Sequence, residues 1–307
     1  MNAGAFVFPG QGSQYVGMGK DLYDHHPRAK KLFYEADEIL GFSLSTICFE
    51  GPEEELRQTR NTQPAIYLHS VVLIALLPEY RPAMAAGHSL GEYSALVCAN
   101  ALSFEDGLKL VRLRGELMQR AGEEQPGTMA AIIGLEGNAV EDLCREAGEA
   151  GIVQPANFNS PGQVVVSGSV PGVRRSMELA KTRGAKMVKE LVVSGAFHSP
   201  LMAKAGQGLR EALVTTTIRD CEIPVYANVT AQPVRKAGEI RDLLYRQLLS
   251  PVRWEESVRS MANDGAAQFT EIGPGKVLQG LIKRIAPAVA VSGIDTYQEY
   301  QRAVSKA

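Results

Sequence analysis

Short apolar runs alternate with longer stretches in which apolar residues recur every three or four positions. Runs of strand length occur at residues 4–8, 83–88, 223–227 and 268–272. Helical periodicity predicts helices at 21–40, 53–59, 64–77, 104–121, 200–213, 238–249, 253–263 and 276–284, with a further helix that begins near Gly91. Pro64 is placed in the first turn of its helix, where proline is tolerated. Strands alternating with helices predict an α/β fold with a mostly parallel sheet.

The pattern changes in the middle of the chain. Residues 122–127, GEEQPG, predict a polar linker. Beyond it, strand, helix, strand, strand, helix and strand are predicted at 128–135, 138–149, 151–158, 163–168, 170–183 and 186–193. This βαββαβ order is that of a ferredoxin-like unit. We therefore expect a small subdomain at 126–195, inserted into a large subdomain formed by 1–125 and 196–307.

The composition is that of an ordinary soluble protein, with 45% hydrophobic and 21% charged residues in a chain of 307. The formal net charge of -2 shows no excess of Lys and Arg, so we expect no nucleic-acid partner. The longest apolar stretch, at 65–77, is too short to span a bilayer, so we expect no membrane partner. The N-terminus lacks a basic region before an apolar run, which predicts that there is no signal peptide.

Four cysteines lie far apart in the sequence: Cys48, Cys98, Cys144 and Cys221. They form no C-x-x-C pair and no Cys/His ligand spacing, so neither a zinc site nor a disulfide framework is indicated. Buried free thiols are typical of a reducing compartment, which predicts a cytoplasmic protein. No motif suggests a metal or redox cofactor.

Residues 87–91, Gly-His-Ser-Leu-Gly, match the pattern G-x-S-x-G. In this pattern the two glycines allow a strand and a helix to approach closely, and the serine is exposed on the sharp turn between them. The predicted strand before Ser89 and helix after it favour a nucleophile over a surface serine in a Gly-rich turn. The N–H of Leu90 is then the natural first oxyanion donor.

Serine needs a neighbouring base, and the chain offers five histidines. His25 and His26 lie in a polar segment and are expected to be solvated. His69 lies within an apolar helix and is expected to be a core histidine. His88 is adjacent to Ser89 and should point to another side of the turn. His198 remains, in a loop after the last strand of the small unit; the alternative is a loop histidine at a hinge.

The acidic third member of a hydrolase triad is missing from its usual place. In α/β-hydrolases the chain order is serine, acid, histidine. Candidate acids between residues 89 and 198 fall mostly in the inserted unit or on helix surfaces. This argues against a standard hydrolase triad, and a neutral acceptor could orient His198 instead.

Arg114 lies in the middle of an apolar helical stripe. Successive helical residues are turned by about 100°, which places on one face Leu110, Leu113, Leu117 and Ala121. Arg112 points the opposite way, and Arg120 lies at the margin. A buried guanidinium needs an anion or several acceptors. Arg114 is therefore either half of a buried ion pair or a clamp for a carboxylate in a pocket.

Seven motifs occur in order along the chain: FPGQGSQ from Phe8, NTQPA from Asn61, GHSLGE from Gly87, Arg114-Gly115, GAFHS from Gly195, Gln247 with PVRW from Pro251, and EIGPG from Glu271. This ordered set resembles the malonyl-CoA:acyl-carrier-protein transacylases of type II fatty-acid synthesis and the related polyketide synthase acyltransferases. They cover essentially the whole chain. The resemblance implies an α/β-hydrolase-like large subdomain that carries the ferredoxin-like one.

The resemblance also implies roles for individual residues. Ser89 would carry the malonyl group, and His198 would be the general base and then the acid. The backbone N–H groups of Gln11 and Leu90 would form the oxyanion hole. Arg114 would clamp the free carboxylate of malonate.

Four further positions have implied roles around the same site. The backbone carbonyl of Gln247 would orient His198, in place of the missing acid. Gln63 and Asn157 would support the pocket. Phe197 resembles the residue of malonyl-selective members, whereas a smaller residue would leave room for the α-methyl of methylmalonate.

The implied reaction is ping-pong transfer from malonyl-CoA to the phosphopantetheine thiol of an acyl carrier protein, without a cofactor. Three alternatives stay open. A stand-alone polyketide synthase acyltransferase would share these motifs. A hydrolase that releases acyl groups from carrier proteins could use the same Ser89 and His198. A non-catalytic module that docks carrier proteins would show no acylation.

Overall fold

The computed structural model describes residues 3–77 and 81–305. Residues 1–2, 78–80 and 306–307, which fall within the predicted large subdomain, lie outside the described residues. The main sheet has the strand order β10-β9-β1-β2-β7-β8. Its strands are β1 (Ala3–Phe8), β2 (Met84–Gly87), β7 (Val225–Tyr226), β8 (Pro233–Val234), β9 (Ala266–Ile272) and β10 (Ala290–Ile294). All neighbours are parallel except β7 and β8, so the predicted mostly parallel sheet is confirmed.

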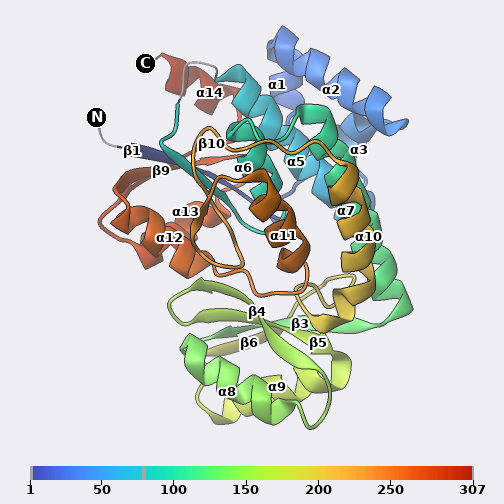
Figure 1. Ribbon diagram of the computed structural model, residues 1–307, viewed down its shortest axis with the longest axis vertical. Helices are drawn as coiled ribbons and strands as arrows, with labels where there is room; N and C mark the ends of the chain where they lie inside the picture. Colours follow the sequence, from blue (N-terminus) through green and yellow to red (C-terminus); the bar gives the residue numbers. More distant parts are fainter. Residues whose placement is uncertain (1–2, 78–80, 306–307) are drawn as a thin grey trace.

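Helices cover both faces of this sheet (Figure 1). They are α1 (Lys20–His25), α2 (Pro27–Leu40), α3 (Leu44–Glu50), α4 (Glu53–Arg57), α5 (Thr59–Leu76), α6 (Gly91–Cys98), α7 (Phe104–Glu124), α10 (Ala203–Thr215), α11 (Ala237–Gln247), α12 (Trp254–Asn263), α13 (Val277–Ile285) and α14 (Tyr297–Val304), with a 3-10 turn at Pro200–Met202. Each helix among the described residues is too short or too polar to cross a bilayer.

The two faces of β1 contribute to two different hydrophobic cores. Phe6 and Phe8 belong to the larger core, which includes residues of α5, α6 and α7. Ala5 and Val7 belong to a second core with residues of α12 and α13. Because successive strand residues point to opposite faces, an uninterrupted apolar run is what a strand buried on both faces requires.

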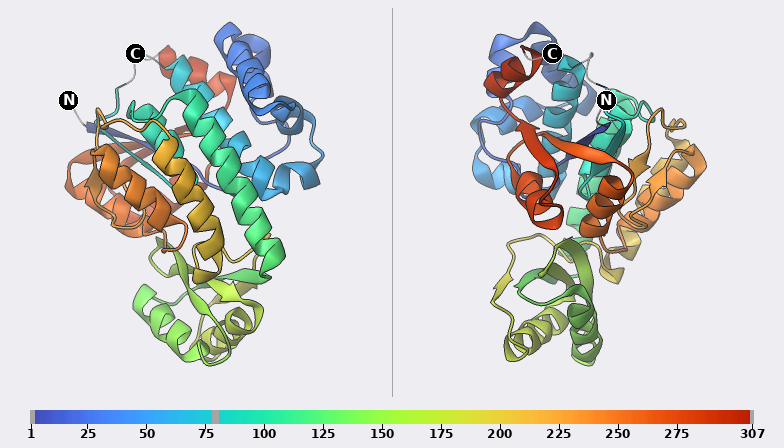
Figure 2. Two further views of the ribbon diagram at one scale, coloured as in Figure 1. Left: turned by 45° about the vertical axis from the view of Figure 1, so that its right-hand side comes forward. Right: turned by 90° about the vertical axis from the view of Figure 1, so that its left-hand side faces the viewer.

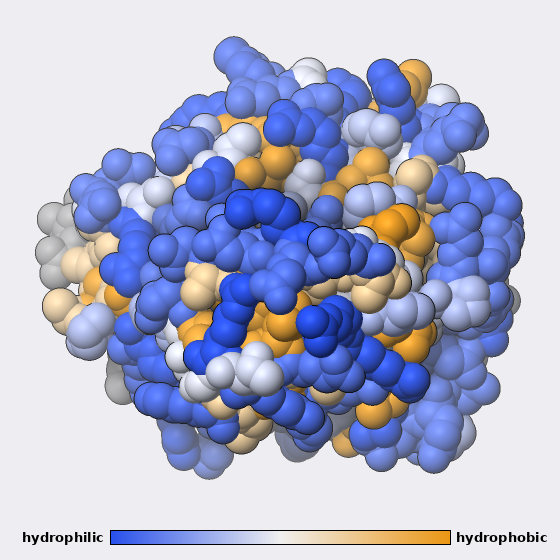
Figure 3. Space-filling model, turned by 90° about the horizontal axis from the view of Figure 1, so that it is seen from below, coloured by the Kyte–Doolittle hydropathy of each residue, from blue (hydrophilic) through white to orange (hydrophobic). Residues whose placement is uncertain are grey.

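A second sheet, with the order β4-β5-β3-β6, is antiparallel throughout. Its elements are β3 (Gly127–Ile133), α8 (Gly137–Ala147), β4 (Val153–Ser160), β5 (Gln163–Ser169), α9 (Val170–Thr182) and β6 (Met187–Glu190). This order confirms the predicted ferredoxin-like arrangement. Residues of α8 and α9 share a core with the sheet, and the surface at this end is mostly hydrophilic (Figure 3).

The antiparallel unit forms a separate lobe below the main sheet (Figure 2). Backbone hydrogen bonds join the two: Phe158 N–H donates to Val252 O at 2.9 Å, and Val252 N–H donates to Ala156 O at 2.8 Å. Gln154 Nε2 donates to the backbone oxygen of His198 at 2.8 Å. The lobes therefore meet beside the predicted base, and the exact subdomain boundaries stay a prediction.

Two helix predictions need correction because of prolines. The helix predicted at 21–40 is split at His26, since Pro27 starts α2. Pro64 lies in the interior of α5 rather than in its first turn, because the helix already begins at Thr59. Pro64 has no N–H to donate to the carbonyl of Arg60. That carbonyl instead accepts from Arg112 Nη1 at 2.9 Å.

Other boundaries differ because tertiary contacts override the local pattern. Helix α7 continues to Glu124, so the predicted linker at 122–127 is half helical. Strand β6 ends at Glu190, three residues early. The pattern also missed α3, β8, β10 and α14. The last of these has no buried residue, and a capping box formed by Thr296 and Glu299 defines its start.

Candidate active site

Ser89 lies on the sharp turn between β2 and α6. Its φ of +51° is in the left-handed region, a strained conformation that is common at functional sites. A Cβ on Gly87 would lie 1.8 Å from the carbonyl carbon of Gly91, and a Cβ on Gly91 would lie 2.1 Å from Phe8 O. Glycine is therefore required at both positions, as the G-x-S-x-G pattern predicts.

His198 contacts the serine directly. Its Nε2 lies 2.8 Å from Ser89 Oγ, and its Nδ1 lies 2.8 Å from the backbone oxygen of Gln247. A carbonyl can only accept, so Nδ1 carries the proton and Nε2 is free to accept one from Ser89. Burial, together with the charge of Arg114, lowers the pKa of His198 to about 3. The imidazole is therefore neutral at neutral pH.

The other histidines have different partners. His88 Nε2 contacts Asn159 Oδ1 at 2.8 Å rather than the serine. His69 is buried and contacts the backbone oxygen of Asp295 at 2.9 Å and its carboxylate at 3.1 Å, as expected of a core histidine. His25 is exposed and His26 half-buried at the junction of α1 and α2.

Arg114 is completely buried beside the nucleophile. Its Nη2 donates to Ser89 Oγ at 3.1 Å and to Gln247 Oε1 at 3.0 Å. Its Nη1 donates to Gln63 Oε1 at 2.8 Å, and the guanidinium lies 5.7 Å from the centre of the Tyr93 ring. Within the described residues it forms no direct ion pair, so the first of the two predicted alternatives is not what the structure contains.

Two further residues, Asn228 and Glu92, belong to the site, although no role was predicted for either from the sequence. Asn228 Oδ1 accepts from the backbone N–H of Ser89 at 2.7 Å, and Asn228 Nδ2 donates to Gly87 O at 2.7 Å. Glu92 Oε2 accepts from the backbone N–H of Asn228 at 3.0 Å. Burial raises the pKa of Glu92 to about 7. Asn228 follows β7, the strand that pairs with β2. Functional residues often lie just beyond the carboxyl ends of parallel strands, and this location is the one sequence signal that could have indicated Asn228.

The side chain of Gln247 joins these groups. Its Nε2 donates to Ser89 O at 2.9 Å and to Glu92 Oε2 at 2.9 Å. The family resemblance implied a role only for its backbone carbonyl. Gln247 therefore contacts three parts of the site. Its Nε2 binds the backbone of Ser89, its backbone oxygen binds His198, and its Oε1 binds Arg114.

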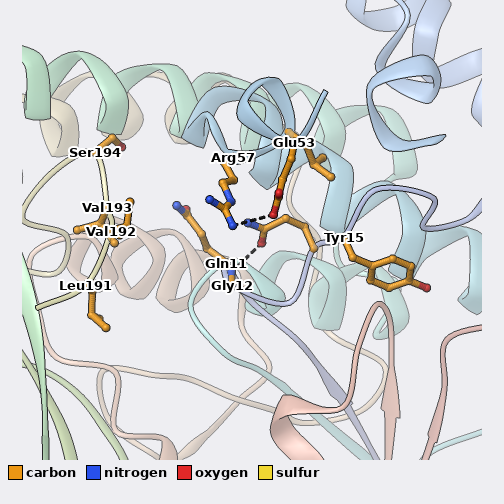
Figure 4. A pocket seen from close by; sticks show the side chains of 11 residues that line it. Gln11, Gly12, Tyr15, Glu53, Arg57, Leu191, Val192, Val193 and Ser194 are labelled. Carbon is orange, nitrogen blue, oxygen red and sulfur yellow. Dashed lines mark hydrogen bonds and ion pairs between the residues drawn. The ribbon is translucent and has the colours of Figure 1, made fainter. Parts of the chain in front are cut away.

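A cavity of about 120 Å³ opens above Ser89. It is lined by all the remaining residues that the sequence analysis assigned to the pocket or oxyanion hole: Gln11, Gln63, Leu90, Asn157 and Phe197. A larger pocket of about 560 Å³ adjoins it and shares Gln11, Leu191 and Val193. Figure 4 shows the segment 191–194 on one side of this larger pocket and Arg57 and Glu53 on the other.

The chain is similar to known acyltransferases over nearly its full length. A model of the acyl transferase domain matches residues 5–298. The malonyl CoA-acyl carrier protein transacylase of Bacillus subtilis strain 168 is 48% identical over 96% of this chain and 95% of the relative. An acyl carrier protein S-malonyltransferase from Vibrio cholerae has a TM-score of 0.94 at 43% identity, covering 98% of this chain and 99% of that one.

A further solved structure was determined with its protein partner. It is a malonyl-transacylase in complex with a type II PKS acyl-carrier protein, with a TM-score of 0.96 at 42% identity, covering 99% of this chain and all of that one. These similarities confirm the family expected from the ordered motifs. This chain belongs to the acyl transferase domain family and is an acyltransferase.

Proposed function

We propose that this chain transfers a malonyl group from malonyl-CoA to the phosphopantetheine thiol of an acyl carrier protein, through an ester on Ser89. The observation that carries the proposal is the buried Arg114 guanidinium, 3.1 Å from the oxygen of a serine that also contacts a neutral histidine. The names of relatives at 41–48% identity support the same substrate and partner.

In the first half-reaction, His198 Nε2 takes the proton of Ser89 as Oγ attacks the thioester carbonyl carbon. The backbone N–H groups of Gln11 and Leu90 would stabilise the oxyanion, since both residues line the cavity at the nucleophile. The carbon–sulfur bond then breaks. The departing CoA thiolate takes the proton from His198, and the malonyl ester remains on Ser89.

Arg114 would bind the free carboxylate of the malonyl group. Guanidinium and carboxylate match in a two-point hydrogen-bonded pair, and Gln63 and Gln247 hold the guanidinium in place. Asn157 and Phe197 would limit the space around the acyl chain. An acetyl group would leave the buried charge without its anion, which disfavours its transfer.

In the second half-reaction, the carrier's thiol would enter through the larger pocket beside Gln11. His198 takes the thiol proton, the sulfur attacks the ester carbonyl, and Ser89 leaves with the proton returned by His198. This chemistry uses no metal or other cofactor, because the chain's own groups move the proton and bind the charge. The free thiols, such as Cys48, suit a cytoplasmic setting.

Intact-protein mass spectrometry after brief exposure to malonyl-CoA tests the proposal. We expect a malonyl adduct on the wild type that is absent from Ser89→Ala and passes to a holo carrier protein. Release of malonate without transfer would identify a hydrolase, and no adduct with any thioester would identify a binding module. Comparison of fatty-acid and polyketide carriers as acceptors separates the two transacylase alternatives.

A further inference from the structure

Glu92 is a buried carboxylate beneath the nucleophile that takes no part in the steps above. It lies in the first turn of α6, and only 3% of its surface is exposed. Its Oε2 accepts two hydrogen bonds, from Gln247 Nε2 at 2.9 Å and from the backbone N–H of Asn228 at 3.0 Å. It therefore contacts two of the groups that hold Ser89, without touching a reacting atom.

The orientation of the Gln247 side-chain amide determines whether its oxygen or its NH₂ group faces Arg114. An amide has one accepting end and one donating end. Because Nε2 donates to Glu92 and to Ser89 O, Oε1 is left to accept from Arg114 Nη2. If the amide were reversed, its NH₂ group would face the guanidinium, and its oxygen would face two other acceptors. Both contacts would be unfavourable in a buried site.

We propose that Glu92 is a positioning residue that fixes the orientation of the Gln247 amide and thereby holds Arg114 ready for the carboxylate of the acyl group. The inference rests on the proposed function, because it concerns selection of acyl groups that end in a carboxylate. The role requires an accepting oxygen rather than a charge. A protonated carboxyl keeps such an oxygen, so the role does not depend on the ionisation of Glu92.

Two neutral variants of similar size separate this role from a general structural one. Glu92→Gln keeps an accepting oxygen, whereas Glu92→Met removes it. The initial rates of Ser89 acylation by malonyl-CoA and acetyl-CoA are measured on the same protein sample, and their ratio is compared. Because both rates scale with the amount of folded protein, that amount cancels in the ratio.

We expect Glu92→Met to lower the malonyl-to-acetyl ratio by about tenfold or more, and Glu92→Gln to keep it within about threefold of the wild type. In an Arg114→Ala background, Glu92→Met should not lower the ratio further, since Glu92 acts through Arg114. That double variant distinguishes an effect on the clamp from an independent effect on the pocket.

Three results would overturn the inference. The first is an unchanged ratio in Glu92→Met. The second is an equal fall of the ratio in Glu92→Gln and Glu92→Met, which would assign the effect to the charge. The third is a further fall in the double variant. Failure of the wild type to accept malonyl at all is seen independently of these variants, and it overturns the proposed function itself.

Discussion

Arg114 Nη2 lies 3.1 Å from Ser89 Oγ, so a buried positive charge and the nucleophile occupy the same site. The other acceptors around the guanidinium are neutral amide oxygens of Gln63 and Gln247. Burial lowers the pKa of Arg114 from its usual value, because taking the guanidinium out of water disfavours its charge, although Tyr93 and Glu92 oppose this effect. A substrate carboxylate bound beside Ser89 would supply the anion that directly pairs with the Arg114 guanidinium.

Arg114→Ala should lower the rate of malonyl transfer to Ser89 by about a hundredfold, because a buried charged hydrogen-bonded pair contributes about 3 kcal/mol. Acetyl transfer should change much less. Arg114→Lys keeps a charge but loses the two-point geometry, and should give an intermediate rate. Acylation reactions quenched at short times and analysed by mass spectrometry give the rate with each substrate. A similar loss for acetyl-CoA and malonyl-CoA would contradict a carboxylate clamp.

The rate of Ser89 acylation should show no inflection near pH 6.5. His198 acts as a base in its neutral form, and its pKa is lowered to about 3 by burial and by Arg114. It therefore stays active as the pH falls from 8 to 5. For a histidine with the ordinary pKa, the fraction in the neutral form would fall about thirtyfold over that range. Single-turnover rates at several pH values check this, and a fall centred near pH 6.5 would refute it.

Gly87→Ala should prevent formation of the nucleophile turn. The added Cβ would lie 1.8 Å from the backbone of Gly91, so strand and helix would have to separate. We expect little soluble protein and no acylation of Ser89. Gly238→Ala is the matched control, because a Cβ there meets nothing within 4 Å. In helix α11 that change should raise the free energy of unfolding by about 0.5–1 kcal/mol.

Local patterns predicted the parts of the site that are set by neighbouring residues. The turn at Ser89 depends on Gly87 and Gly91, and the inward position of Arg114 depends on helical periodicity. Both can be read from a few consecutive positions. The buried apolar run at residues 4–8 predicted β1 for the same reason, because its side chains fill two cores.

Contacts between distant segments could not be predicted in this way. Asn228 and Ser89 are 139 positions apart, and Gln247 and Glu92 are 155 apart. No periodicity links such residues. The family resemblance alone suggested the Gln247 carbonyl, and the only signal for Asn228 was its location just after a strand of the parallel sheet. Strand β8 has only two residues, which is too short to produce an alternating pattern. Helix α5 contains Pro64 in its interior, and the carbonyl of Arg60 that Pro64 leaves without its helical donor accepts from Arg112, a residue 52 positions away in the sequence.

Asn228→Ala should weaken both the turn and the nucleophile. It removes the acceptor for Ser89 N–H and the donor to Gly87 O, and each buried group left without a partner costs about 1–3 kcal/mol. We expect a lower free energy of unfolding and at least about tenfold slower acylation. Asn138→Ala, at an exposed position that contacts its neighbour Ala139, is the control. Equal stability of the two variants in urea would argue against this role.

The stability of the fold should depend on the ionisation of Glu92. Burial raises its pKa from 4.5 to about 7, so the folded chain binds a proton more tightly than the unfolded chain does. The resulting stabilisation is fully present below pH 4.5 and is lost as the pH rises through 7. The shift corresponds to about 3 kcal/mol.

Glu92→Gln removes this titration and leaves every other group in place. Its free energy of unfolding, relative to that of the wild type, should therefore increase by about 2–3 kcal/mol between pH 5 and pH 8. Glu271, which caps α13 through the N–H groups of Leu278 and Gln279, also has a pKa raised to about 7 by burial. Glu271→Gln should change in the same direction. Urea denaturation at both pH values measures these free energies of unfolding. If the difference between Glu92→Gln and the wild type is the same at pH 5 and pH 8, Glu92 keeps its ordinary pKa in the folded chain.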